Sequence, residues 1–306
     1  FVLNELPDLQ PRIQVSLFSI LEEKEIQIRG FKVRLPLDIQ FIFTSNPEDY
    51  TNRGTIVTPL KDRIGSQILT HYPESIEIAK QITEQESRLN SQVVSKIHIP
   101  EIARDIIEQI SFEARESDLI DKKSGVSARM SITSLQNLVS SAERRMIINN
   151  EKQTSIRMSD FNSVISSING KVELVYEGEE EGAEQVSYNL ISDAVKSLFN
   201  KYFPKIEKLS KPDEETPYDS LLEWFTQKQL IIGDNLKNNE YEELLIEIID
   251  ARTIIDKYVK DLDDNDKFFF IEFILWGLES FNKLSILRTN NGIEFKDPFN
   301  NFINKI

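Results

Sequence analysis

Apolar and polar positions alternate at the start of the chain as they do in an α/β layer. The run Phe-Val-Leu ends in Asn4 and Glu5, which predicts the end of a buried strand with polar groups at its tip. Apolar positions at helical spacing over residues 9–22 predict a helix, and alternation over 26–35 around a glycine predicts a β-hairpin. The run Phe-Ile-Phe at 41–43 predicts a second strand. The expected order is therefore strand, helix, hairpin and strand.

From residue 73 onward, helical spacing of apolar residues predominates. Pro100 opens one of these helices, because proline favours the first helical turn. An acidic stretch over 171–185 is expected to be a linker, and beyond it the pattern predicts helices without strands. The predicted helices cover residues 74–89, 100–114, 127–148, 158–168, 186–203, 218–227, 241–259 and 267–287, and the predicted loops cover 205–217 and 290–306.

Length and charge limit the classes of function. The 306 residues are enough for about two domains. A net charge of −15 argues against broad binding to nucleic acid or to anionic membranes. The most apolar run, at 268–278, contains Glu272 and is about half as long as a membrane span. These features predict a cytoplasmic protein without a membrane span.

Cysteine is absent, which excludes disulfides and thiolate metal sites in these residues. The two histidines, His71 and His98, are too few to favour a histidine-based metal site. We expect His98 to have a packing role. Neither histidine is placed near an activated serine by the sequence, so no catalytic triad is predicted.

Four motifs in the first 65 residues place polar residues at strand tips and an arginine on a short turn after them. The motifs are Asn-Glu-Leu-Pro-Asp at 4–8, the hairpin at 26–35, Ser-Asn-Pro-Glu-Asp at 45–49 and Leu-Lys-Asp-Arg-Ile-Gly at 60–65. Together they resemble the second half of an AAA+ core of the magnesium-chelatase and MoxR-like group. The resemblance implies the C-terminal half of an α/β AAA+ core over 1–72, an α-helical lid over 73–170, the acidic linker over 171–185 and an all-helical C-terminal domain over 186–306.

The resemblance also implies roles for individual residues. Glu5 matches the catalytic glutamate of the Walker B motif, Asn46 matches sensor 1, which positions the attacking water, and Arg63 matches the arginine finger. Arg129, in Gly-Val-Ser-Ala-Arg at 125–129, matches the sensor 2 arginine that contacts nucleotide phosphate. The implied cofactors are ATP and Mg²⁺, with Asn4 and Glu5 contacting the metal through water.

The sequence departs from the family pattern in two ways. Asn4 stands where the Walker B aspartate is expected, so the metal site has one charge fewer. No Gly-x-x-x-x-Gly-Lys-Ser/Thr occurs in the 306 residues, so the phosphate-binding loop is missing from them. We expect a fragment that begins at Walker B, is inactive alone and hydrolyses ATP as part of the full-length protein.

Two functions of different classes remain open. The first is a ring-forming AAA+ ATPase, with six subunits expected, that remodels a partner or assists metal insertion; proteins with a von Willebrand A domain are the partners that the resemblance implies. The second is a non-hydrolysing AAA+ scaffold or adaptor whose C-terminal helices bind a partner protein. A helical DNA-binding regulator is disfavoured because of the acidic charge.

Overall fold

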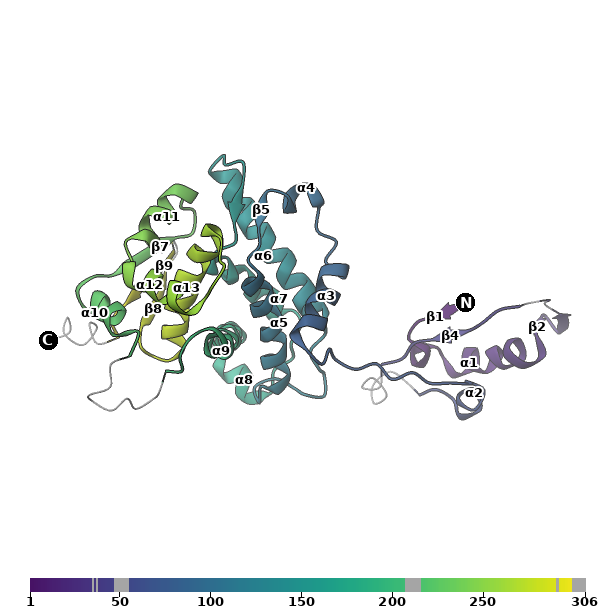
Figure 1. The fold of residues 1–306 in the computed structure, drawn as a ribbon. Helices are drawn as coiled ribbons and strands as arrows, with labels where there is room; N and C mark the ends of the chain where they lie inside the picture. The colour runs from purple at the N-terminus through teal and green to yellow at the C-terminus, as the bar shows by residue number, and fades with distance from the viewer. Residues whose placement is uncertain (35, 37, 47–54, 207–215, 290–291, 299–306) are drawn as a thin grey trace. The chain divides into compact units, whose positions relative to one another are not determined.

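The computed structural model describes residues 1–34, 36, 38–46, 55–206, 216–289 and 292–298. The chain divides into two compact units, Phe1–His71 and Tyr72–Ile306 (Figure 1). The end of the predicted hairpin at Leu35, the loop residues 47–54 and most of the predicted 205–217 loop lie outside the described residues.

The first unit contains the elements predicted from its apolar pattern. Its strands are β1 (Val2–Leu3), β2 (Glu25–Ile28), β3 (Phe31–Arg34) and β4 (Ile42–Phe43), and its helices are α1 (Pro11–Phe18) and α2 (Thr58–Lys61). Strands β2 and β3 pair antiparallel through the two-residue turn Arg29–Gly30, both with positive φ, 50° and 88°. Such a turn matches the twist of a hairpin and favours glycine at its second position. The predicted hairpin is therefore present.

Strands β1 and β4, which lie 40 positions apart in sequence, pair in parallel. Val2 is the partner of Ile42, and Leu3 is the partner of Phe43. The buried amide of Gln14 on α1 fixes the segment that leads into α2: its Nε2 donates to Thr55 O at 3.2 Å and its Oε1 accepts from Val57 N at 2.9 Å. A buried glutamine thus ties α2 to α1.

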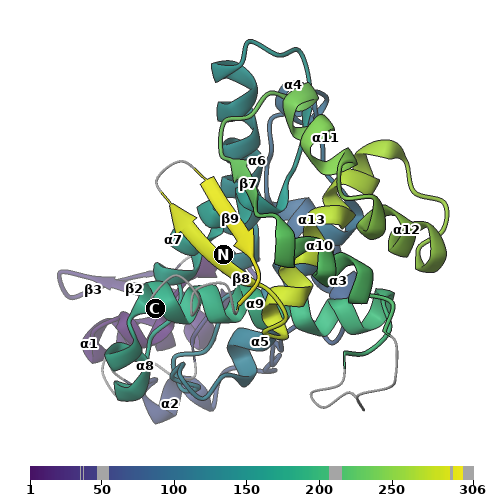
Figure 2. The same ribbon diagram turned by 90° about the vertical axis from the view of Figure 1, so that its left-hand side faces the viewer.

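The second unit is mainly helical and has one continuous hydrophobic core. Its helices are α3 (Ile76–Glu86), α4 (Ser91–Val94), α5 (Glu101–Glu116), α6 (Arg129–Ile148), α7 (Ile165–Asn169), α8 (Tyr176–Glu181), α9 (Ala183–Tyr202), α10 (Asp219–Gln227), α11 (Asn238–Ile246), α12 (Ile249–Tyr258) and α13 (Asp264–Ser280). A 3-10 helix spans Met158–Val164. Helix α9 packs against both α5 and α13 (Figure 2).

The prediction that the C-terminal region is all helical is wrong. Strands β7 (Leu230–Gly233), β8 (Ser285–Thr289) and β9 (Gly292–Lys296) form an antiparallel sheet with β9 in the centre (Figure 2). The predicted helix over 267–287 ends earlier, because Asn282 takes a left-handed conformation (φ 57°) after α13. The predicted loop at 290–306 contains β9, while its last residues lie outside the described ones.

The second unit also contains a short pair of parallel strands and an isolated β-bridge. Strands β5 (Ile97–His98) and β6 (Thr154–Ser155) pair in parallel. The stretch 171–185, predicted as a linker, contains α8, and Leu174 bridges to Ile120. The lid and C-terminal segments form one compact unit, and the boundary between them stays a prediction. Within the described part of the chain, no helix has both the length and the apolar character to cross a bilayer.

Candidate functional site

The polar residues at the tips of β1 and β4 lie on neighbouring parallel strands. The amide of Glu5 donates to the hydroxyl of Thr44 at 3.0 Å, and the amide of Leu6 donates to the carbonyl of Thr44 at 2.9 Å. Parallel strands end at the same edge of a sheet. Asn46 follows β4 by three positions and is exposed, as are Asn4 and Glu5. The structure therefore brings Glu5 and the Asn46 segment to one edge.

The backbone of Glu5 has an uncommon conformation. Its φ and ψ, 51° and 58°, lie in the left-handed region, which is costly for a residue with a Cβ atom. The hydrogen bond to Thr44 and the 3-10 turn Leu6–Asp8, in which Leu6 is buried, hold it there. Strained conformations of this kind cluster at functional sites, which is consistent with a role for Glu5.

The donor set at this edge suits a magnesium ion bound through water. Asn4 offers an amide oxygen, which accepts from the Thr44 hydroxyl at 3.4 Å, and Glu5 offers a carboxylate. Mg²⁺ prefers oxygen ligands, keeps several waters and takes one or two protein carboxylates together with substrate phosphates. Asn4 and Glu5 fit this pattern with one charge fewer than two acids would supply.

Arg63 is held within its own unit. Its Nε lies 2.8 Å from Glu22 Oε1, its Nη2 donates to Glu22 Oε2 at 3.1 Å, and its Nη1 donates to Pro59 O at 2.7 Å. The guanidinium also lies 5.2 Å from the centre of the Phe18 ring. The side chain remains 32% exposed. Arg63 is therefore a positioned and accessible cation just after α2.

Arg129 belongs to the second unit. It is the first residue of the 20-residue helix α6, and its side chain is exposed. The preceding residue, Ala128, has no side chain that can cap the helix. The hydroxyl of Ser127 accepts from the amide of Arg129 at 3.2 Å. A helix N-terminus next to an arginine favours anions.

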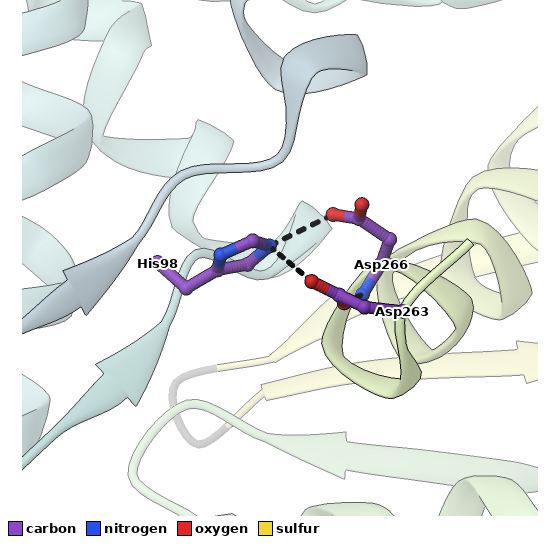
Figure 3. A group of neighbouring side chains, drawn as sticks. All are labelled: His98, Asp263 and Asp266. Atoms are coloured by element: carbon purple, nitrogen blue, oxygen red, sulfur yellow. Dashed lines mark hydrogen bonds and ion pairs between the residues drawn. The ribbon is translucent and has the colours of Figure 1, made fainter. Parts of the chain in front are cut away.

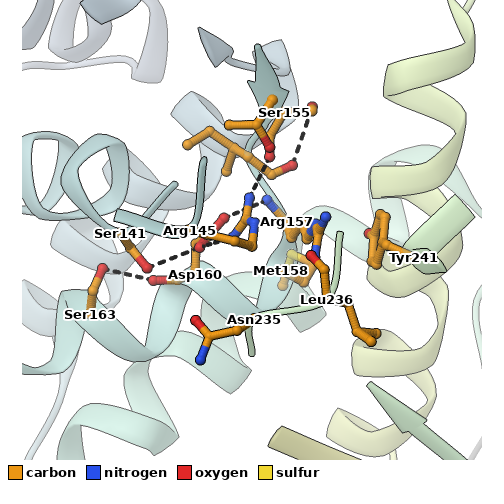
Figure 4. A network of polar contacts seen from close by, with 12 residues as sticks. Ser141, Arg145, Ser155, Arg157, Met158, Asp160, Ser163, Asn235, Leu236 and Tyr241 are labelled. Carbon is orange, nitrogen blue, oxygen red and sulfur yellow. Dashed lines mark hydrogen bonds and ion pairs between the residues drawn. The ribbon is translucent and has the colours of Figure 1, made fainter. Parts of the chain in front are cut away.

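A buried polar network in the second unit was not predicted from the sequence (Figure 4). Arg145 pairs with Asp160, and both side chains are almost fully buried. The Arg157 guanidinium stacks 4.0 Å above the ring of Tyr241, and the Tyr241 hydroxyl donates to Glu272 at 2.6 Å. Burial raises the pKa of Glu272 to about 7. The only sequence signal was an acidic residue within the apolar run at 268–278.

The predicted packing role of His98 is wrong. Its Nε2 lies 2.8 Å from Asp266 Oδ1 and 3.9 Å from Asp263 Oδ2 (Figure 3). These aspartates lie at the start of α13, more than 160 positions further along the chain. No spacing rule connects residues so far apart, so the sequence alone could not have found this cluster.

Comparison with known protein families and with curated proteins finds no match to this chain. Among solved structures, the chain is similar to a candidate ATPase from Cytophaga hutchinsonii, with 20% sequence identity and a TM-score of 0.26. The similarity covers 62% of this chain and 64% of that chain, which is less than two thirds of its length. At this TM-score, the likeness carries no argument about fold or function.

Proposed function

We propose that these residues belong to a ring-forming AAA+ ATPase of the magnesium-chelatase and MoxR-like group. ATP hydrolysis would drive the remodelling of a partner protein or assist metal insertion, and a protein with a von Willebrand A domain is the expected partner. Hydrolysis sites would lie between the subunits of a hexamer. In each site, Glu5 and Asn46 of one subunit would meet Arg63 of its neighbour.

One observation carries this proposal: the parallel pairing of β1 with β4. The register Leu3 to Phe43 and the hydrogen bond from Glu5 N to Thr44 Oγ1 bring a carboxylate and the Asn46 segment to the same strand edge. Open α/β sheets bind ligands at the carboxyl ends of their parallel strands. A carboxylate and an amide at such an edge suit the activation and positioning of a water molecule.

Each residue has a defined part in the proposed reaction. Glu5 accepts a proton from the attacking water, and Asn46 holds that water by hydrogen bonding. Asn4 and Glu5 would contact Mg²⁺ through water, and the ion would neutralise phosphate charge. Arg129, at the start of α6, would contact phosphate and couple the nucleotide to the position of the lid.

Arg63 is the proposed arginine finger. Its guanidinium has the planar fork that stabilises charge developing on a transferred phosphoryl group. The bidentate pair with Glu22 keeps that fork oriented and on the surface of the subunit. Because Glu22 is itself 55% exposed, exchanging this partner for a phosphate on a neighbouring subunit has a small cost.

The proposal requires a phosphate-binding loop in addition to these residues. Parallel sheets are normally covered on both faces, yet Val2 on β1 and Ile42 on β4 are 55% and 51% exposed. We infer that these strands pack against the half of an AAA+ core that carries the phosphate-binding loop, in the same chain or another.

Complementation between variants of the full-length protein tests the proposal. Arg63→Ala should lower ATP hydrolysis by about three orders of magnitude or more and leave nucleotide affinity nearly unchanged. Glu5→Gln should also be inactive. Mixed rings of the two variants should recover activity, because a Glu5→Gln subunit supplies Arg63 to the intact Glu5 of its neighbour. Arg12→Ala, at an exposed arginine on α1, is the matched control and should hydrolyse ATP normally.

The results distinguish the two functions. Normal ATP turnover by Arg63→Ala would show that Arg63 is not an arginine finger. If mixed rings of the two variants stay inactive, Arg63 does not act on the site of a neighbouring subunit. Nucleotide binding without turnover by the unmodified protein would favour the non-hydrolysing scaffold. The observation that favours this second function is the neutral Asn4 at the β1 tip, where an aspartate would hold the metal more tightly.

A further inference from the structure

We propose that His98, Asp263 and Asp266 form a binding site for one divalent first-row transition-metal ion, with the chemistry of Zn²⁺. The site lies in the second unit, joins β5 to the start of α13 and is independent of the proposed ATPase function. Figure 3 shows the imidazole directed at both carboxylates.

The donor atoms are close enough to share one ion. Nε2 of His98 lies 2.8 Å from Asp266 Oδ1 and 3.9 Å from Asp263 Oδ2, and the three donor atoms all lie within 4.8 Å of one another. Ligands at about 2.1 Å from a tetrahedral ion are about 3.4 Å apart. The observed separations bracket this value, so small side-chain rotations would complete the coordination.

The three ligands are held by regular structure. His98 lies on β5, where its carbonyl accepts from the amide of Ile156 at 2.9 Å. Asp263 caps α13: its Oδ1 accepts from the amide of Asp266 at 2.8 Å, while its Oδ2 is the atom turned toward the imidazole. A carboxylate that is fixed through its second oxygen is typical of metal ligands, because the hydrogen bond orients the ligating atom.

The charge of the cluster and the space beside it also suit a cation. Asp263 and Asp266 bring two carboxylates to the imidazole, while Lys267 pairs with the neighbouring Asp264 at 3.7 Å. A cavity of about 330 Å³ lies next to the cluster and is lined by His98 and Asn265. Lys96, Arg157 and Glu242 also line it. The cavity has room for a water molecule as fourth ligand.

The mixture of ligands selects the class of metal. Mg²⁺ and Ca²⁺ prefer all-oxygen sites, whereas imidazole together with carboxylates suits Zn²⁺ and its neighbours in the first transition row. Binding would add to the link between β5 and α13 that the hydrogen bond between His98 and Asp266 already makes. The ion should therefore stabilise the second unit, since a ligand that binds only the folded state raises its stability.

Calorimetric titration of the full-length protein with Zn²⁺, in excess Mg²⁺, tests the site. His98→Gln, Asp263→Asn and Asp266→Asn should each weaken Zn²⁺ binding by about tenfold or more. Asparagine is as good a helix cap as aspartate, so Asp263→Asn should still fold. Asp264→Asn is the matched control, because it removes one charge from the same helical turn without removing a ligand, and it should bind Zn²⁺ like the unmodified protein.

Two further readouts separate a built site from loose attraction to an acidic surface. Co²⁺ bound by the unmodified protein should give the visible absorption of a tetrahedral complex, and His98→Gln should lose it. Saturating Zn²⁺ should raise Tm for the unmodified protein but not for His98→Gln. Two results would overturn the proposal. One is that His98→Gln binds as much Zn²⁺ as the unmodified protein, and the other is that Asp264→Asn weakens Zn²⁺ binding as much as Asp263→Asn does.

Discussion

The amide of Glu5 donates a 3.0 Å hydrogen bond to the hydroxyl of Thr44, across the two parallel strands of the first unit. The same hydroxyl lies 3.4 Å from the side-chain oxygen of Asn4. One threonine thus holds both polar residues at the tip of β1. This contact keeps Glu5 in its left-handed conformation, which would otherwise be disfavoured.

The proposed ATPase function therefore predicts a positioning role for Thr44. Thr44→Val keeps the shape of the side chain but removes the hydroxyl, so the Glu5 amide loses its partner. We expect kcat of the full-length protein to fall about fivefold, in line with one hydrogen bond of about 1 kcal/mol, with little change in nucleotide affinity. Thr44→Ser keeps the hydroxyl and should retain activity. Equal activity of Thr44→Val and the unmodified protein would contradict this role.

Stability should depend on pH through Glu272. Burial raises the pKa of this carboxyl from 4.5 to about 7, so the folded protein holds a proton that the unfolded chain has lost between these values. Stability from this group therefore falls as pH rises through the window from about 4.5 to about 7 and stays low above it.

Glu272→Gln should remove this dependence. Relative to the variant, the unmodified protein should lose roughly 2 kcal/mol of unfolding free energy between about pH 5.5 and about pH 8. Urea denaturation of both proteins at the two pH values measures the difference. If the difference in unfolding free energy between the unmodified protein and Glu272→Gln is the same at the two pH values, Glu272 does not titrate in this window.

Helices with strong local patterns could be predicted from the sequence. The expected helices at 100–114, 127–148 and 186–203 correspond to α5 (Glu101–Glu116), α6 (Arg129–Ile148) and α9 (Ala183–Tyr202). In these segments amphipathic spacing, together with Pro100 at the first of them, agrees with the tertiary packing. The strand tips carrying Glu5 and Asn46 were predicted for the same reason, because apolar runs ending in polar residues identify them.

The predictions that failed concern segments whose structure depends on contacts with residues elsewhere in the chain. The apolar run after residue 268 gives no sign that α13 stops at Ser280, since apolar residues continue into β8. β9 becomes a strand because it lies between β8, which comes just before it in the chain, and β7, which comes from much earlier in the chain. The clusters around His98 and around Asp160 were missed because their members come from separate elements that only folding brings together.

The buried pair of Arg145 and Asp160 should be a strong determinant of stability. Asp160 also accepts from Ser141 Oγ at 2.9 Å and from Arg157 N at 2.8 Å. Asp160→Asn keeps the size of the side chain but leaves Arg145 buried without a counter-charge. We expect a loss of about 3–5 kcal/mol in unfolding free energy, measured by urea denaturation.

A second substitution makes this prediction specific. Adding Arg145→Met to Asp160→Asn should restore part of the lost stability, because the uncompensated charge is gone. The exposed pair of Lys122 and Asp118, 3.0 Å apart, provides the control, and Asp118→Asn should be nearly neutral. An Asp160→Asn variant as stable as the Asp118→Asn variant would show that the buried pair is not needed.

Close packing of α13 on α9 should depend on Gly277. A Cβ atom at this position would lie 2.1 Å from Cδ2 of Phe199, which is fully buried and whose ring centre lies 6.1 Å from that of Phe273. Because the ring is enclosed, it cannot move away freely. Gly277→Ala should therefore lower the unfolding free energy by about 1–3 kcal/mol, despite the better helix propensity of alanine.

Gly170→Ala is the control for the substitution itself, since a Cβ atom there would meet only a carbonyl oxygen at 3.5 Å and φ is −85°. It should leave stability unchanged or slightly raised. Shortening the opposing side chain gives the decisive comparison by urea denaturation. In a Phe199→Leu background, where the ring is gone, Gly277→Ala should cost less than it does in the unmodified protein. An equal cost in both backgrounds would mean that contact with Phe199 is not the reason for glycine at this position.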